Sequence, residues 1–220
     1  MDRDSNWEKI KSSLGTEGLE LGPYITYNLL HGCLLFRLSR YKFATRLIGE
    51  APRVNILDLG CSEGLGTFLL AGDFHTATGV DSDKEAIQWA ESNLEGRSNS
   101  ITFRHDNFLG KTYGKFDAVV ALDVIEHIPS EQEGMFFETV ASNLDKDGYC
   151  VIGTPNITAS QYSSEQSKMG HINLFSAERL RDIMRRHFKN AFLFGMNDEV
   201  VHTGFYPMSH YLVALGCGRR

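Results

Sequence analysis

A glycine-rich turn between an apolar strand and an apolar helix constrains the fold of this 220-residue chain more than any other feature. The stretch reads NILDLGCSEGLGTFLL and begins at Asn55. Residues 54–59 read as a buried strand, Gly60, Gly64 and Gly66 follow it, and a helical apolar pattern comes next. Glycine has no Cβ and accepts positive φ, and the N–H groups that open a helix point toward a ligand. The stretch therefore predicts a strand, a turn and a helix that bind a nucleotide-like cofactor.

Apolar strands and helical segments alternate from residue 54 onward, which is typical of a doubly wound α/β sheet. The expected strands are 54–59, 76–80, 101–104, 118–122, 149–153, 190–195 and 211–216. The expected helices include 84–93, 131–143 and 177–187. A loop, 196–210, rather than a crossover helix separates the last two strands, so the last strand should run antiparallel. We predict a Rossmann-like, seven-stranded mixed sheet.

The first fifty residues read as helices that precede this sheet. Leucines and one tyrosine recur there at helical spacing, at Leu29, Leu30, Leu34, Leu38, Tyr41 and Leu47, with Arg37, Arg40, Lys42 and Arg46 between them. Such a basic amphipathic element is a helix covering one sheet edge, a lid, or a membrane-surface contact. We expect residues 1–50 to form a helical lid or cover and residues 51–220 to form the main domain.

Composition narrows the classes of protein. The formal net charge of -6 disfavours a surface that binds nucleic acid. Neither an apolar core behind a basic N-terminus nor an apolar run of about eighteen residues is present, so we expect a soluble protein without a secretion signal or transmembrane segment. The four cysteines, Cys33, Cys61, Cys150 and Cys217, are scattered singly, which favours reduced thiols in a cytoplasmic protein. The oligomeric state stays open.

Acidic and amide side chains follow two further strands at the edge where the glycine turn lies. Asp81 ends the second strand, 81 − 60 = 21 positions after Gly60, where a carboxylate accepts from both hydroxyls of a ribose. Asp106 and Asn107 end the third strand, where an Asp side chain accepts from an adenine amino group. Either aspartate alone would more simply be a turn residue or a helix N-cap. Their joint position predicts an adenosine site.

Five segments, in this order, resemble a class I S-adenosylmethionine-dependent methyltransferase: ILDLGCSEGLGTFLL, GVDSDKEAIQWA, FRHDNF, KFDAVVALDVIEHI and LDKDGYCVIGTPN. The resemblance covers roughly residues 50 to 220. A nicotinamide dehydrogenase is the competing interpretation of a glycine turn followed by a ribose acid. The spacing G-x-G-x-x-G is absent, however, and an acid two positions before Gly60 suits a sulfonium amino acid better than a pyrophosphate.

The resemblance assigns a cofactor role to individual residues. It implies that Asp58 orders the glycine loop and the methionine part of S-adenosylmethionine, and that the loop passes close to this cofactor. It further implies ribose binding at Asp81, adenine binding at Asp106 and Asn107, and a pocket wall at Leu122. The implied cofactor-binding set is Asp58, Gly60, Cys61, Ser62, Gly64, Asp81, Ser82, Asp106, Asn107 and Leu122. Ser62 stands where the family usually carries glycine, so its side chain must point away from the cofactor or bond to it.

Methyl transfer to a hydroxyl needs a group that takes the proton, and the sequence after the fourth strand carries candidates. Asp123, Glu126 and His127 lie within one helical turn, and His171 comes from the loop after the fifth strand. These four could ligate a divalent cation, Mg²⁺ or Mn²⁺; failing that, His127 or His171 acts directly as base. The set resembles the acid-x-x-Glu-His plus distant His site of metal-dependent small-RNA 2′-O-methyltransferases. Similar Glu-His sequences occur in ubiquinone-pathway O-methyltransferases.

Simpler alternatives exist for the same residues. Asp123 as N-cap and Glu126 three residues later form a capping box, and His171 could bind a backbone carbonyl. Transfer to a hydroxyl oxygen of a small metabolite, such as a sugar, a phenol or a natural-product intermediate, is the leading functional hypothesis. An RNA methyltransferase or an N-methyltransferase is one alternative, and the RNA methyltransferase would require a continuous basic track that the composition does not obviously supply. A non-catalytic adenosylmethionine-binding module is another, and it would have no need of the histidines.

Overall fold

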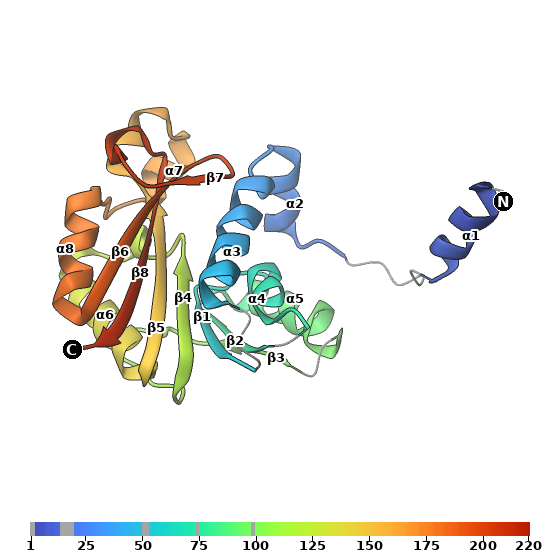
Figure 1. The fold of residues 1–220 in the computed structure, drawn as a ribbon, viewed down its shortest axis with the longest axis horizontal. Helices are drawn as coiled ribbons and strands as arrows, with labels where there is room; N and C mark the ends of the chain where they lie inside the picture. The colour runs from blue at the N-terminus through green and yellow to red at the C-terminus, as the bar shows by residue number, and fades with distance from the viewer. Residues whose placement is uncertain (1–2, 14–19, 50–52, 74, 98–99) are drawn as a thin grey trace.

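The computed structural model describes residues 3–13, 20–49, 53–73, 75–97 and 100–220. Its strands form one sheet in the order β3-β2-β1-β4-β5-β8-β6-β7 (Figure 1). They are β1 (Asn55–Leu59), β2 (Thr76–Asp81), β3 (Ile101–His105), β4 (Phe116–Leu122), β5 (Leu144–Pro155), β6 (Phe188–Asn197), β7 (Val200–His202) and β8 (Tyr211–Arg219).

The pairing confirms the predicted doubly wound sheet with an antiparallel last strand. Strands β1 to β5 are parallel, whereas β8 lies between β5 and β6 and is antiparallel to both. The described residues form eight strands, and the predicted number of seven is therefore wrong. The additional strand β7 lies within the expected loop 196–210, where Gly195 to Asn197 pair with Val200 to His202 as a hairpin.

Helices cover both faces of the sheet and divide the core into two layers. Helices α3 (Leu34–Ile48), α4 (Leu65–Ala71) and α5 (Lys84–Asn93) bury Ala44, Leu70 and Ile87 against one face. Helices α6 (Glu133–Asn143) and α8 (Ala177–His187) bury Phe136 and Leu180 against the other. Complete burial of a large apolar side chain contributes about 1.5 to 3 kcal/mol. These two layers hold the carboxyl edge of the sheet in a fixed arrangement.

Side-chain caps determine where several of these helices begin. The Asp83 carboxylate accepts from the N–H groups of Glu85 and Ala86 at 2.9 and 3.1 Å, which starts α5 directly after β2. The Ser176 hydroxyl accepts from the Arg179 N–H at 3.2 Å and starts α8. Each cap satisfies backbone donors that the first helical turn leaves without a partner.

Within the described part of the first fifty residues, three helices have different surroundings. Helix α1 (Arg3–Ser13) lies apart from the sheet in Figure 1, and residues 6–13 are exposed. Helix α2 (Pro23–Leu30) is separated from α3 by Gly32, whose φ of 73° is left-handed. Helix α3 packs into the core, and the Tyr149 hydroxyl donates to the Ile48 carbonyl at 3.0 Å. The expected domain boundary at 50/51 lies outside the described residues.

The segment after β5 is partly helical rather than a plain loop. It contains the short 3-10 helix η4 (Ile157–Tyr162) and helix α7 (Glu165–Gly170), which brings His171 to its C-terminal end. Within the described part of the chain, no helix combines the length and the apolar character that crossing a membrane requires. All four cysteines are free thiols.

Candidate functional site

A cavity of about 830 Å³ lies at the carboxyl ends of β1, β2 and β4 and is covered by α2 and α3. Residues of the glycine turn line it, and so do Tyr24, Ile25 and Arg37 from α2 and α3. Eight of the ten predicted cofactor residues line it: Gly60, Cys61, Ser62, Gly64, Asp81, Ser82, Asn107 and Leu122. The predicted set thus consists largely of residues that line one cavity.

The glycine turn adopts left-handed backbone at three positions. Gly60 has φ 77°, Ser62 has φ 51° and Gly64 has φ 78°. A Cβ at Gly60 would lie 2.4 Å from Val124 Cγ2, so this position also lacks room for a side chain. Ser62 takes a conformation that glycine adopts at lower cost. Its N–H donates to Asp81 Oδ2 at 2.7 Å, and this bond holds the turn against β2.

Asp81 is fixed at the cavity wall by two backbone donors. Its Oδ2 accepts from Ser62 and its Oδ1 accepts from the Asp83 N–H at 2.9 Å. A carboxylate has about four acceptor sites, so each oxygen keeps one for a further donor. The carboxylate is thus oriented and still able to accept from two neighbouring hydroxyls.

Asp58 lies beneath the glycine turn and is not part of the cavity wall. The residue is 0% exposed, and its Oδ2 accepts from the Thr67 hydroxyl at 2.6 Å. Its Oδ1 has no hydrogen-bond partner within the described protein. Burial raises the pKa of Asp58 to about 7, against the lowering effect of the Thr67 hydrogen bond. The side chain is therefore an acceptor with one oxygen still available.

Asp106 does not reach the cavity wall, although the sequence predicted it as an adenine contact. Its carboxylate forms an ion pair with Lys111 and accepts from the Tyr113 hydroxyl at 3.0 Å. The Lys111 hydrogen bond lowers the pKa of Asp106. Its neighbour Asn107 does line the cavity. Of these two neighbours, Asn107 therefore lies at the cavity, whereas the Asp106 carboxylate is bound to Lys111 and Tyr113.

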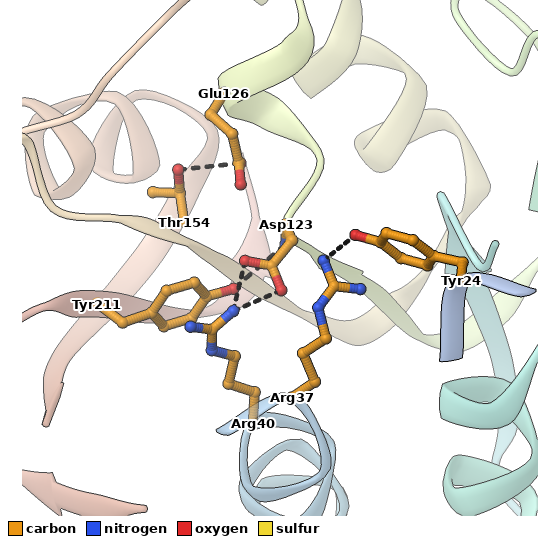
Figure 2. Close-up of polar contacts among 7 residues, drawn as sticks. All are labelled: Tyr24, Arg37, Arg40, Asp123, Glu126, Thr154 and Tyr211. Carbon is orange, nitrogen blue, oxygen red and sulfur yellow. Dashed lines mark hydrogen bonds and ion pairs between the residues drawn. The ribbon is translucent and has the colours of Figure 1, made fainter. Parts of the chain in front are cut away.

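Asp123, one of the predicted metal ligands, forms an ion pair with Arg40 of α3 (Figure 2). Arg40 Nη1 lies 2.7 Å from both carboxylate oxygens, and its guanidinium stacks 3.8 Å from the Tyr211 ring centroid. Asp123 has φ 60°, and its N–H donates to the Tyr211 hydroxyl at 3.2 Å. Burial alone would raise the pKa of Asp123, but the charges of Arg40 and Arg37 lower it.

The expected four-residue metal set is therefore reduced to three. Ligand atoms of Glu126, His127 and His171 lie within 4.8 Å of one another, and Asp123 is not among them. The capping-box alternative is also wrong, because no side chain caps the 3-10 helix η2 (Ile125–His127). Both the four-ligand metal site and the capping box required the Asp123 carboxylate, and this carboxylate is paired with Arg40 instead.

Glu126 is a buried carboxyl behind the two histidines. It is 0% exposed, and its Oε2 accepts from the Thr154 hydroxyl at 3.1 Å (Figure 2). Its Oε1 has no hydrogen-bond partner among the described residues. Burial, followed by the negative charge of Asp123, raises the pKa of Glu126 to about 8. A proton is therefore retained on this carboxyl near neutral pH.

The histidines meet at the cavity rim. His127 lines the cavity, and its Nδ1 lies 2.9 Å from the Gly170 carbonyl oxygen. A carbonyl only accepts, so Nδ1 is the donor and Nε2 carries the lone pair in the neutral ring. The His171 ring lies edge-on to it with centroids 5.0 Å apart. Burial, together with the charge of His127, lowers the pKa of His171. The carbonyl contact predicted as an alternative for His171 is made by His127 instead.

Three functional residues of this site were not predicted as such. Arg37 and Arg40 appear in the sequence only as basic residues of an amphipathic helix, spaced three apart as residues on one helix face are. Arg37 donates to the Tyr24 hydroxyl, and its guanidinium lies 4.6 Å from the Tyr24 ring centroid (Figure 2). Glu63, within the glycine turn, binds the backbone of α2. No local pattern signals any of these partners.

Comparison with known proteins agrees with this geometry. Residues 33–187 match the family model described as a methyltransferase domain. The chain therefore belongs to this family, and its sheet is that of the class I S-adenosylmethionine-dependent methyltransferases.

Individual relatives are distant. The chain is 28% identical over 114 residues to the ubiquinone biosynthesis O-methyltransferase of Glaesserella parasuis, covering 49% of this chain and 48% of that protein. It thus spans about half the length of the curated relatives it matches. The methyltransferase domain of bacterial CtHen1 is similar in fold, with TM-score 0.66, 16% identity and coverage of 83% of this chain and 99% of that one. The N-methyltransferase NodS from Bradyrhizobium japonicum, in complex with S-adenosyl-L-homocysteine, gives TM-score 0.64, 20% identity and coverage of 83% and 87%.

Proposed function

We propose that this methyltransferase moves the methyl group of S-adenosylmethionine to a hydroxyl oxygen of a small-molecule metabolite, such as a sugar, a phenol or a natural-product intermediate. The observation that carries the proposal is one cavity whose lining includes the glycine turn, Asp81 and His127. A cofactor cradle and a proton acceptor thus share one space, which an in-line transfer requires.

The residues at the glycine turn fit the cofactor. Asp81 keeps an acceptor site on each oxygen for the two ribose hydroxyls, and Asn107 faces the cavity where its amide suits an adenine edge. Asp58 lies beneath the turn and outside the cavity wall, so in this proposal it supports the turn through its bond to Thr67 rather than by contact with the cofactor. When bound, S-adenosylmethionine supplies an electrophilic methyl group, which leaves its sulfur for the acceptor oxygen and yields S-adenosylhomocysteine.

His127 is the proposed catalytic base. The Gly170 carbonyl holds the proton on Nδ1, so Nε2 is free to take the proton from the acceptor hydroxyl as the new C–O bond forms. The His171 ring lies against the His127 ring. The pKa of His171 is lowered, which favours a neutral His171 that does not repel the positive charge developing on His127. In this version Glu126 stays protonated behind the pair.

A divalent cation is the second version of the same site. Glu126, His127 and His171 would hold it, and its charge would lower the pKa of a bound hydroxyl. Asp123 would have to leave Arg40 to become a fourth ligand, and this exchange would leave a buried arginine without its counter-charge. We therefore favour the histidine base and keep the cation as an outcome of the experiments below.

Transfer to oxygen is favoured by the name shared by the curated relatives, ubiquinone biosynthesis O-methyltransferase. A small acceptor is favoured by a net charge of -6, which disfavours a nucleic-acid partner. Arg37 is the only lysine or arginine among the cavity-lining residues of the described chain. A wall with one basic residue offers few partners for the phosphates of a nucleic acid.

Transfer of a radiolabelled methyl group from S-adenosylmethionine to a panel of catechols, phenols and sugars tests the proposal. We expect a labelled product whose new methyl group is attached to oxygen in its NMR spectrum. Labelling of amines or of RNA alone would support the alternative acceptor classes. Tight binding of S-adenosylhomocysteine without turnover on any panel would support a non-catalytic binding module.

A further inference from the structure

Glu63 is a charged residue of the glycine turn that the proposed chemistry does not use, yet only 4% of it is exposed. Its Oε1 accepts from the Tyr24 N–H at 2.8 Å and its Oε2 accepts from the Ile25 N–H at 2.9 Å. These donors belong to the first turn of α2, whose own N-cap residue, Gly22, offers no side-chain cap. A carboxylate at this end of a helix also favours the helix dipole. Glu63 therefore caps α2 from 38 residues away in the sequence.

The start of α2 is shaped to receive this carboxylate. Pro23, the first helical residue, has no N–H, so the next two residues supply the donors. Gly22 has φ -64°, which any residue adopts, so its backbone does not require glycine. A Cβ there would lie 2.3 Å from the Glu63 carboxylate. Space for Glu63 is thus the reason that Gly22 lacks a side chain.

The cap joins two parts of the cavity lining, the glycine turn and α2. On one side, the neighbouring Ser62 N–H holds Asp81, the proposed ribose ligand, and Gly64 begins α4. On the other side, Tyr24, Ile25 and Asn28 of α2 line the cavity. A shift of the glycine turn at Glu63 therefore moves the donors at the start of α2, and release of α2 leaves a buried carboxylate without partners. Leaving such a group unpaired is costly.

We infer that Glu63 is a positioning residue that couples cofactor binding at the glycine turn to the placement of α2 over the cavity. The inference rests on the proposed cofactor site. Coupling is reciprocal: a cofactor that orders the turn stabilises α2, and loss of the cap weakens cofactor binding by the same factor. An ordinary structural cap would stabilise α2 equally with and without cofactor.

The test is hydrogen exchange of the α2 amides, measured by mass spectrometry with and without S-adenosylhomocysteine. The variant Glu63→Gln keeps the shape but replaces one acceptor oxygen with a donor group, so it cannot accept from both N–H groups. We expect S-adenosylhomocysteine to slow exchange in α2 of the unmodified protein and to have little effect there in the variant. We also expect affinity for S-adenosylhomocysteine to be about tenfold weaker in the variant.

Ser176→Ala is the matched control, because it removes the cap of α8 on the other face of the sheet. It should leave both the affinity and the protection of α2 unchanged. Gly22→Ala disturbs the same contact from the α2 side and should reproduce the loss of coupling, so it carries the test if Glu63→Gln does not fold. Full cofactor-induced protection of α2 in the folded variants would overturn the inference. Absence of any S-adenosylhomocysteine binding to the unmodified protein would instead refute the proposed function itself.

Discussion

Arg40 of α3 and Asp123 after β4 form an ion pair across 83 residues of sequence, with Nη1 2.7 Å from both carboxylate oxygens. Most of each side chain is buried, and Tyr211 covers the guanidinium. The pair fastens α3 to the edge of the sheet where the cavity lies. It also removes Asp123 from the histidines, which decides the ligand set of the candidate site.

Replacement of Asp123 by asparagine should destabilise the protein by about 3 kcal/mol, because it leaves the buried Arg40 charge without its partner. Asparagine tolerates the left-handed backbone at this position, so the lost stability measures removal of the Asp123 charge rather than backbone strain. Urea denaturation measures the change. The double variant Asp123→Asn, Arg40→Met should recover part of the lost stability; a single variant as stable as the unmodified protein would contradict the role of the pair.

Asp58 should make stability depend on pH. Burial raises its folded pKa to about 7 from an ordinary value of 3.8, so between these values the unfolded chain binds fewer protons than the folded one. Stability from this group is therefore complete below about pH 4, falls as pH rises toward 7, and is flat above. We expect Asp58→Asn, which does not titrate, to gain stability relative to the unmodified protein between pH 4.5 and 7.5. Urea denaturation at both pH values checks this, and a constant difference would refute it.

Asp81→Asn should weaken S-adenosylhomocysteine about tenfold or more in calorimetric titration, because it removes a charge-assisted acceptor for the ribose hydroxyls. Asp106→Asn is the matched comparison. The Asp106 carboxylate is bound to Lys111 and Tyr113, so we expect less than about a threefold change. Equal losses in the two variants would instead support the adenine contact that the sequence predicted for Asp106.

His127→Ala should lower kcat about 100-fold or more, as expected for loss of a general base, while leaving the affinity for S-adenosylhomocysteine unchanged. His171→Ala should cost less, because this ring supports His127 and lies outside the cavity wall. Wild-type turnover in both variants would eliminate the proposed site.

Chelation separates the two versions of that site. If His127 acts directly, treatment with EDTA leaves activity unchanged and added Mn²⁺ leaves the melting temperature unchanged. If a cation binds at Glu126, His127 and His171, EDTA abolishes activity, Mg²⁺ or Mn²⁺ restores it, and Mn²⁺ raises the melting temperature by mass action. Glu126→Gln should remove that thermal shift.

Structural features that depend on consecutive residues could be predicted from the sequence. The glycine turn at Gly60 and the acid at Asp81 were found because strand, turn and helix follow one another locally. Strand β7 was missed because it is only three residues long. Its turn is Asp198-Glu199, which lacks the glycine of the common hairpin dipeptides, although Asp198 has a left-handed φ of 51°.

Contacts between elements that are far apart in the sequence could not be predicted from it. The sequence gives Asp123 and Glu126 the spacing of a ligand pair, yet Arg40, from a different helix, takes one of the carboxylates. Likewise, nothing near Glu63 reveals that its partners are backbone donors of α2. In both cases the partner depends on how α2 and α3 pack on the sheet. The local hydrophobic pattern of a single sequence does not reveal that packing.

The hydrogen bond between His127 and the Gly170 carbonyl ties the chemistry of a ring to the position of a backbone segment. While α7 stays docked, the ring has a single proton arrangement, and its lone pair lies on Nε2. Undocking of α7 would let the two nitrogens exchange their proton through solvent, so the fraction of molecules ready to accept a proton would fall although no charge had been lost. In the proposed mechanism, a substitution that weakens the docking of α7 would lower kcat in proportion to the fraction of molecules in which α7 is undocked.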